Sequence, residues 1–329
     1  MSMPILVSSF LLSIFLSITI QRYFLKNNIV DSIKDRSSHN SLATRSGGIS
    51  IFISIFLLSI FYYIIGNEIY NFSLLIPLSI LVLIGLYDDL NEIDYKLKFI
   101  FQIIAAKIII DNGLIIDNLH GVFGLFELNR IFAQALTIFV IVAIINSMNF
   151  IDGIDGLAIT ISILFILSFE FFSNSITPYN NLSQIILSTI VPLYFFNFKK
   201  KNKIFLGDSG SLLLGGIVSI YVITILTNDY VIKPEFDMHK IIFVFSILSY
   251  PIIDVIRIFF NRLYNKKSPF QPDKNHIHHL INNRFNNHFK TLIVILVSYL
   301  GILSVLQFVS WLQNRASSIL STRKIRVNF

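Results

Sequence analysis

Carboxylates and amides are concentrated in one short stretch of an otherwise apolar region, residues 146–158, with the sequence NSMNFIDGIDGLA. A carboxylate that is buried or lies beside a membrane costs free energy unless it is paired, hydrated or bound to a cation. Asn146, Asn149 and Asp152 recur every three residues, so their side chains lie close together if a helix continues that far. The pattern indicates a site more than a loop, although Asp155 alone could simply cap the following helix.

Two further acidic groups stand at the ends of apolar runs. Asp88 and Asp89, in LYDDLNEID, follow an apolar run, where carboxylates oppose the helix dipole. Adjacent carboxylates either share a cation or divide into an ionised and a proton-holding member, as metal binding or general acid–base catalysis requires. Asp208, in FLGDSGSLLLGG, precedes an apolar run, where it could cap a helix or bind a hard cation such as Mg²⁺.

Basic side chains that suit phosphate accompany these acids. His276, His278 and His279 lie in SPFQPDKNHIHHL, where the absence of a nearby Cys or Glu makes zinc a poorer interpretation than a pyrophosphate. The remaining candidates are Lys98 and, in HNSLATRSGGI, His39 and Arg45. Carboxylates for a divalent cation and basic groups for phosphate together predict a polyphosphate substrate.

The composition places these residues in a membrane protein. The 329 residues are 54% hydrophobic and 14% charged, with a mean hydropathy of +0.71, against roughly 45–50% and 25% in soluble domains. There are no cysteines, which excludes thiolate metal sites, thiol nucleophiles and disulfides. In a membrane protein the formal charge of +7 is expected to report orientation and anionic partners, so no nucleic-acid partner is predicted.

Ten apolar runs are each long enough to cross a hydrocarbon core of roughly 30 Å as a helix. They lie at residues 4–21, 47–66, 72–87, 97–110, 131–148, 157–173, 183–198, 211–228, 240–260 and 291–312. Open sheets cannot span lipid and the runs lack barrel alternation, so helices are expected. We predict one all-α polytopic membrane domain over residues 1–329, with a small outer β-hairpin at residues 111–130.

The basic residues predict the orientation of this domain. If the N-terminus lies outside, the inner segments hold sixteen Lys and Arg residues, whereas the outer loops between spans hold two, with Lys240 at a boundary. This asymmetry follows the positive-inside rule. The basic tail after Trp311 disagrees, because an even number of spans places it outside. The candidate residues described above then all fall at the inner face.

Four motifs, taken in order, resemble those of the polyprenyl-phosphate N-acetylhexosamine-1-phosphate transferases, glycosyltransferase family 4. They are LYDDLNEID, INSMNFIDGIDGLA, IFLGDSGSLLLGG and SPFQPDKNHIHHL, and the resemblance extends over nearly the whole chain. The H-x-H-H pattern that follows PFQPD is similar to the bacterial undecaprenyl-phosphate N-acetylglucosaminyl 1-phosphate transferase branch. The phospho-N-acetylmuramoyl-pentapeptide transferase branch usually has three contiguous histidines, which Ile277 interrupts here.

The resemblance implies that a UDP-N-acetylhexosamine gives its sugar phosphate to undecaprenyl phosphate, with Mg²⁺ or Mn²⁺ as cofactor and UMP as product. It implies metal ligation by Asp208, Asp152 and Asn149. It implies catalytic roles for Asp88, Asp89, Lys98 and Asp152. It implies substrate binding by Asn146, Asn149, Gly153, Asp155, Asn197, Phe205, His276, His278, His279, Arg45 and His39.

The same resemblance predicts a location in the bacterial inner membrane, with the active site facing the cytoplasm, and a role at the start of cell-envelope polysaccharide synthesis. A homodimer is compatible with the sequence. Two alternatives stay open: the peptidoglycan-precursor transferase branch and, in a different class, a multi-span ion transporter. The transporter is disfavoured because its coupling groups would lie near the membrane midplane, whereas these residues lie at the ends of the predicted spans.

Overall fold

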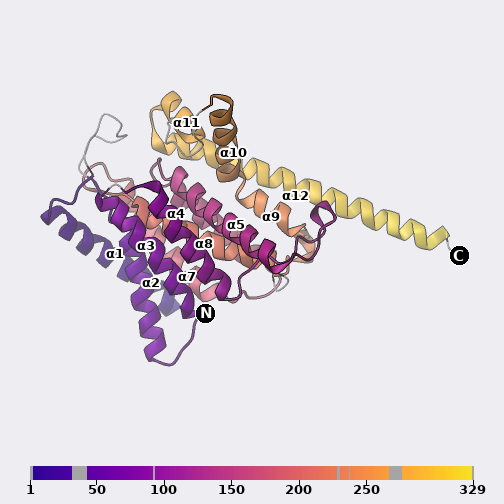
Figure 1. Cartoon of the computed structure of the whole chain (residues 1–329), viewed down its shortest axis with the longest axis horizontal. Coiled ribbons are helices and arrows are strands. Elements are labelled where there is room, and N and C mark those ends of the chain that lie inside the picture. The colour runs from indigo at the N-terminus through magenta and orange to yellow at the C-terminus, as the bar shows by residue number, and fades with distance from the viewer. Residues whose placement is uncertain are drawn as a thin grey trace.

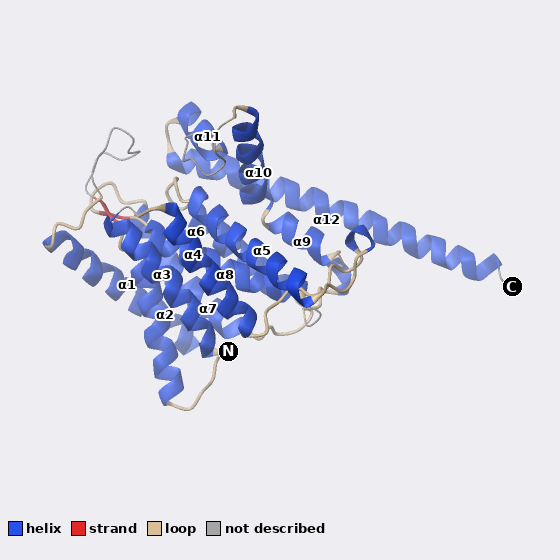
Figure 2. Cartoon of the chain, in the orientation of Figure 1, coloured by secondary structure: helices blue, strands red, loops and turns tan. Residues whose placement is uncertain are grey.

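The computed structural model describes residues 3–31, 43–91, 93–227, 230–236, 238–266 and 276–327, with side chains described up to residue 309 except at position 123. The described chain is mostly helical, with one very short pairing of strands (Figure 2). The first helices are α1 (Met3–Lys26), α2 (Gly47–Ile64), α3 (Leu75–Asn91), α4 (Tyr95–Asp111), α5 (Arg130–Ile151) and α6 (Leu157–Phe172). The later ones are α7 (Asn180–Asn197), α8 (Gly207–Leu226), α9 (Lys240–Ile247), α10 (Ser249–Tyr264), α11 (Ile277–Phe285) and α12 (His288–Val327).

Each predicted apolar run is mainly helical in the described residues, but the ninth is broken into α9 and α10, whose axes are bent by 80°. The break has a local cause in Pro251. In a continuous helix its ring would clash with the carbonyl of Ile247, four residues earlier, and it has no N–H to donate to that carbonyl. Pro77 has no such effect because it lies in the first turn of α3, where its missing N–H would have no helical partner.

Six helices of the described chain are long and apolar enough to cross a membrane: α1, α2, α3 with its preceding 3₁₀ turn (Phe72–Asn91), α5, α8 and the first part of α12. The bent pair α9–α10 would make a seventh. This architecture is the one expected of a polytopic membrane protein. The number of ten spans stays a prediction.

Helix α8 forms the centre of the bundle, and its apolar segment, which is long enough to cross a membrane, is entirely buried. It packs against α2, α3, α5 and α6, and Figure 2 shows these helices gathered around it. Two contacts require glycine. A Cβ on Gly48 would lie 2.0 Å from the backbone N of Gly210, and a Cβ on Gly85 would lie 2.6 Å from the carbonyl of Asp208. Small residues therefore let α2 and α3 approach the first turns of α8.

Two segments outside the bundle core matter for the site. Strand β1 (Ala43–Thr44) pairs in parallel with β2 (Lys203–Ile204), which ties the segment before α2 to the segment before α8. Helices α10 and α11 lie together at one end of the molecule, from which α12 extends beyond the bundle (Figure 1).

The segment predicted as an outer hairpin contains the 3₁₀ turn η2 (Val122–Gly124) and a single antiparallel bridge between Asn118 and Glu127. The backbone N–H of Leu119 donates to the carbonyl of Phe126 at 2.8 Å. The chain therefore turns back on itself here, but no strand is assigned within residues 111–130, all of which are described.

Candidate active site

The Asp208 carboxylate, in the first turn of α8, joins three helices. Its Oδ2 lies 2.9 Å from Lys98 Nζ on α4, and its Oδ1 accepts a hydrogen bond of 3.0 Å from Asn149 Nδ2 on α5. The same Asn149 amide nitrogen lies 2.8 Å from the hydroxyl oxygen of Ser211. Asn149 and Lys98 together fix the direction of the Asp208 carboxylate.

Asp88 and Asp89 have different partners although they are adjacent in α3. Asp88 Oδ2 lies 2.7 Å from Lys98 Nζ, and Asp88 Oδ1 accepts a hydrogen bond of 2.8 Å from the backbone N–H of Ile93. Lys98 therefore bridges Asp88 and Asp208. Asp89 faces away from this lysine toward the start of α8.

Asp89 caps α8 from another helix. Its two carboxylate oxygens accept hydrogen bonds from the backbone N–H groups of Asp208, at 2.9 Å, and Ser209, at 3.0 Å, and its side chain is only 1% exposed. These N–H groups have no partner inside their own helix, and a carboxylate is favourable at the positive end of the helix dipole. Gly207 has φ +73°, and a Cβ there would lie 2.7 Å from Asp89 Oδ2. The interpretation that Asp208 itself caps α8 is wrong, because Asp89 does so.

Asn146 and Asn149 lie on α5 and Asp152 directly follows its last residue, but the three side chains share no common partner in the described residues. Asn146 donates to the Gln102 Oε1 on α4 at 2.7 Å, one turn before Asn149. Within the described part of the chain, the Asp152 carboxylate has neither a hydrogen-bond nor an ion-pair partner. Burial, followed by repulsion from Asp208 and Asp89, raises the pKa of Asp152 well above its usual value.

The repulsion between Asp152 and the neighbouring carboxylates bears on whether this site could bind a divalent cation. No group of three His, Asp or Glu side chains among the described residues forms a ready-made metal site. Mg²⁺ does not need one, since it is usually held by one or two carboxylates together with substrate phosphates and water. A partnerless Asp152 carboxylate that is repelled by Asp208 is the environment such a cation would neutralise, with the Asn149 amide oxygen as a third donor. The residues present therefore fit Mg²⁺.

Asp155 belongs to a second charged network beside the first. Its carboxylate pairs with Lys203 on β2 and, at 3.0 Å, with His288 Nδ1 at the start of α12. Burial opposes ionisation of Asp155, but the hydrogen bonds from His288 and Lys203 outweigh it and lower its pKa. The capping alternative for Asp155 is wrong, because Gly156 occupies the N-cap of α6 with φ +75° and Asp155 makes no capping hydrogen bond.

The segment before α8 brings two further candidate residues to this network. Phe205 lies beside Lys203, whose Nζ is 5.7 Å from the centre of its ring. Asn197, at the end of α7, donates to the carbonyl of Ile204 at 3.0 Å, and its Oδ1 is buried without a hydrogen-bond partner in the described residues. Asn197 therefore supports the backbone that presents Phe205.

The histidines gather over the end of α5. A Cβ on Gly153 would lie 3.0 Å from His278 Nε2 and 3.2 Å from the His279 ring. The His276 ring stacks on that of His278 at 5.4 Å and 15°. His278 is fully buried, and burial, followed by repulsion from His279 and His276, lowers its pKa to about 3, so it is neutral. Its Nε2 has no described partner.

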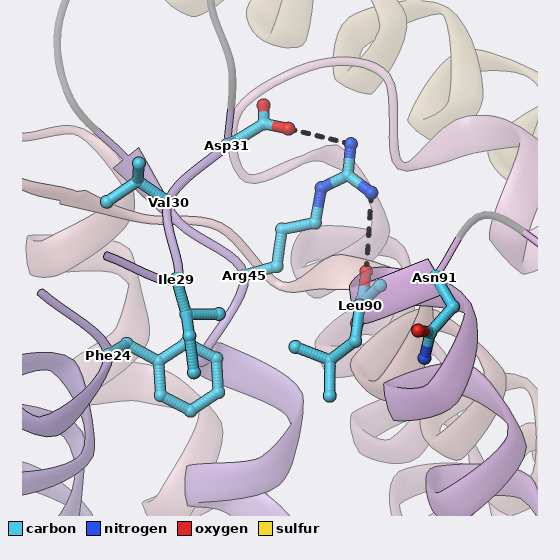
Figure 3. A pocket seen from close by; sticks show the side chains of 8 residues that line it. Phe24, Ile29, Val30, Asp31, Arg45, Leu90 and Asn91 are labelled. Carbon is cyan, nitrogen blue, oxygen red and sulfur yellow. Dashed lines mark ion pairs between the residues drawn. The ribbon is translucent and has the colours of Figure 1, made fainter. Parts of the chain in front are cut away.

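Arg45 lines an open pocket of about 330 Å³ at the ends of α1 and α3 (Figure 3). Its guanidinium lies 2.8 Å from Asp31 and 3.7 Å from Asp89. Phe24 and Leu90 form apolar parts of the pocket wall. Arg45 therefore lies next to the Asp89 carboxylate that caps α8. His39, the other candidate of this segment, lies outside the described residues.

Several residues of the site could not be recognised from their sequence positions. His288 stands alone in the sequence with no motif around it, and only the fold brings it to Asp155. Tyr250 and Asp254 on α10 reach the histidines: the Tyr250 hydroxyl lies 3.2 Å from His278 Nδ1, and Asp254 Oδ2 lies 2.7 Å from His276 Nδ1. Lys203 was counted only among the sixteen basic residues of the predicted inner segments. An interior carboxylate in the broken ninth run was the only available signal.

Comparison with known proteins identifies the family of this chain. A family profile described as glycosyl transferase family 4 matches residues 71–226, which include Asp88, Asp208 and the whole of α5. The chain belongs to this family. An undecaprenyl-phosphate N-acetylglucosaminyl 1-phosphate transferase named as probable, from Bacillus subtilis, is 30% identical over 292 residues, which cover 87% of this chain and 79% of that protein.

Two other relatives match most of the chain at identities of 28% and 31%. The undecaprenyl-phosphate alpha-N-acetylglucosaminyl 1-phosphate transferase of Escherichia coli K12 is 31% identical over 84% of this chain and 76% of its own length. The decaprenyl-phosphate N-acetylglucosaminephosphotransferase of Mycobacterium tuberculosis is 28% identical over 80% and 71%. These names match the resemblance noted in the motifs and do not favour the peptidoglycan-precursor or transporter alternatives.

Proposed function

We propose that this protein transfers N-acetylhexosamine 1-phosphate, with N-acetylglucosamine as the expected sugar, from a UDP-sugar to undecaprenyl phosphate and releases UMP. The observation that carries the proposal is the convergence of Asp88, Lys98, Asn149 and Asp208 from four helices, next to the partnerless Asp152. The names of the relatives support the acceptor and the sugar.

In the proposed reaction, an oxygen of the acceptor phosphate bonds to the phosphorus that carries the sugar, and the bond from that phosphorus to UMP breaks. Lys98 is placed to bind a phosphate between Asp88 and Asp208. The acceptor phosphate is already largely ionised near neutral pH, since its second pKa is about 6. Asp88 is therefore assigned an orienting role through Lys98, with no need to remove a proton.

Asp208 and Asp152, with the Asn149 amide oxygen, are the residues that would hold Mg²⁺. When bound, the cation neutralises the charge of the pyrophosphate as it develops during transfer. For the donor nucleotide, the network of Asp155, Lys203 and Phe205 offers a carboxylate and an aromatic ring at one place. The histidines above Gly153 offer ring nitrogens to the pyrophosphate or sugar.

The orientation in the membrane is part of the proposal. A ten-span topology with the positive-inside bias would put this site at the cytoplasmic face of the bacterial inner membrane, within reach of the anionic head of the acceptor. The interfacial position lets a water-soluble donor meet a lipid acceptor.

The test mixes purified protein with undecaprenyl phosphate, Mg²⁺ and UDP-N-acetylglucosamine and measures UMP release. We expect release that needs both the acceptor and the cation. A panel of UDP-N-acetylhexosamines then identifies the donor. No UMP from any member of the panel would overturn the proposed function.

A further inference from the structure

The Asp254 carboxylate on α10 holds the start of α11 at two points. Its Oδ2 lies 2.7 Å from the Nδ1 of His276, and its Oδ1 accepts a hydrogen bond of 2.8 Å from the backbone N–H of Ile277. Its side chain is 1% exposed, and Arg257 lies 3.2 Å from the same Oδ1. Asp254 is therefore buried, and both of its carboxylate oxygens have partners.

This contact decides which ring nitrogen of His276 carries a proton. An ionised carboxylate only accepts hydrogen bonds, so His276 Nδ1 must be the donor. The Nε2 is then the one ring nitrogen that Asp254 leaves available, which is how a carboxylate orients a functional imidazole in many sites.

The packing of His276 places that imidazole beside the candidate active site. Its ring lies 5.5 Å from the Phe150 ring, and Phe150 directly follows Asn149 in α5. On its other contact it stacks on His278, whose Nε2 is buried beside Gly153 without a partner in the described chain. The His276 ring therefore cannot turn without disturbing the layer of side chains over the end of α5.

A purely structural role explains only half of the contact. Capping the N-terminus of α11 needs one oxygen, which the N–H of Ile277 already uses. The other oxygen accepts the hydrogen bond from His276, in a buried position where a carboxylate oxygen without a partner would cost free energy. These two contacts of Asp254, with the His276 ring and with the backbone of Ile277, form a clamp that connects α10 to the start of α11.

We propose that Asp254 is a positioning residue of this enzyme, which holds His276 through a proton on Nδ1 and so presents Nε2 to the donor pyrophosphate, to which Nε2 donates in the doubly protonated imidazolium form. The inference rests on the proposed function for the identity of the ligand. The clamp itself is independent of it, because it is defined by contacts within the protein.

The first experiment reads the tautomer without turnover. The nitrogen chemical shifts of His276, assigned by comparison with His276→Ala, are measured in the wild type and in Asp254→Asn. We expect a protonated Nδ1 in the wild type and a changed pattern in Asp254→Asn, because an amide can present N–H groups to Nδ1. An unprotonated Nδ1 in the wild type would overturn the inference, even if UMP release fails for another reason.

The second experiment is a double-mutant cycle on UMP release. We expect Asp254→Asn to lower kcat about 10- to 100-fold, the usual cost of losing an orienting partner, and to add little in a His276→Ala background. Equal losses in both backgrounds would mean that Asp254 acts through the α11 N-terminus alone, which overturns the role assigned to His276. Wild-type turnover in Asp254→Asn would do the same.

Two controls keep the cycle interpretable. Glu170→Gln changes another well-bonded carboxylate, on α6, which accepts hydrogen bonds from Thr177 and Ser183 away from the site. We expect it to keep its kcat. Asp254→Glu keeps the charge, so it should recover part of the activity. If Asp254→Asn does not fold, the cycle is run with Asp254→Glu, whose kcat loss must also disappear in the His276→Ala background.

Discussion

The carboxylate of Asp89 on α3 accepts a hydrogen bond of 2.9 Å from the backbone N–H of Asp208 on α8, across 119 positions of sequence. Asp89 therefore sets the position of the first turn of α8 and, with it, the carboxylate of Asp208. This makes Asp89 a positioning residue, whereas Asp88 faces Lys98. The two adjacent acids have distinct tasks.

Replacing Asp89 with Asn should destabilise the protein and impair turnover together. The amide can accept only one of the two backbone N–H groups and turns its own donors toward the other, which leaves a buried N–H unsatisfied at a cost of about 1–3 kcal/mol. Melting temperature in detergent and UMP release measure the two effects. An Asp89→Asn protein that keeps its melting temperature but loses activity would contradict the capping role.

Asp208→Asn should lose most of its turnover while it still inserts and folds. The backbone hydrogen bonds from Asp208 and Ser209 to Asp89 survive the change, but the charge that would hold a cation is lost, and we expect kcat to fall by about 100-fold or more. The matched control is Asp111→Asn, which removes an exposed carboxylate paired with Lys107. Unchanged turnover in Asp208→Asn would remove this residue from the site.

The pair between Lys203 and Asp155 predicts a dependence of stability on pH. The folded pKa of Asp155 is lowered, so its stabilisation is fully present above the unfolded value of about 3.9 and is lost as the pH falls through the lowered folded value. At about pH 7.5, Lys203→Met should reduce the free energy of unfolding by about 1–3 kcal/mol, since Asp155 loses one charged partner. The loss is limited because His288 remains as the second partner.

Melting temperatures at about pH 7.5 and about pH 3.5 check this prediction. The difference between wild type and Lys203→Met should shrink at the lower pH. Lys199→Met is the control, since Lys199 is exposed and contacts only the Phe196 ring among the interactions described, at 4.4 Å. A Lys203→Met effect that is the same at both pH values would show that lost packing, and not the charge pair, is responsible.

Gly48→Ala should prevent correct packing of α2 on α8. Its Cβ would lie 2.0 Å from the backbone N of Gly210, so a helix backbone must move, at a cost of about 1–3 kcal/mol or more. Gly301→Ala in α12 meets no atom within 4 Å and should be tolerated. The yield of monodisperse protein after detergent extraction compares the two. Equal yields would show that α2 can shift without penalty.

The broken ninth run illustrates what local rules can and cannot predict. Apolar length correctly predicted helix over residues 240–260, and Pro251 supplies the reason for the break. The bend of 80° and the contact of Asp254 with His276 depend on how α10 packs against other helices. A single interior Asp could therefore be noticed in the sequence, but its partner and its role could not be predicted from it.

The sequence by itself determined the membrane class, the helical runs, the family and the set of acidic, basic and amide residues at the ends of those runs, because apolar length, charge bias and motif spacing are local properties. Only the tertiary structure decided how these residues are partnered. It separated Asp88 from Asp89, gave Asp155 to Lys203 and His288, and brought Asp254 to the histidines. Partnership depends on the register between helices distant in sequence, which here is set by the close approach of backbones at residues such as Gly48 and Gly85.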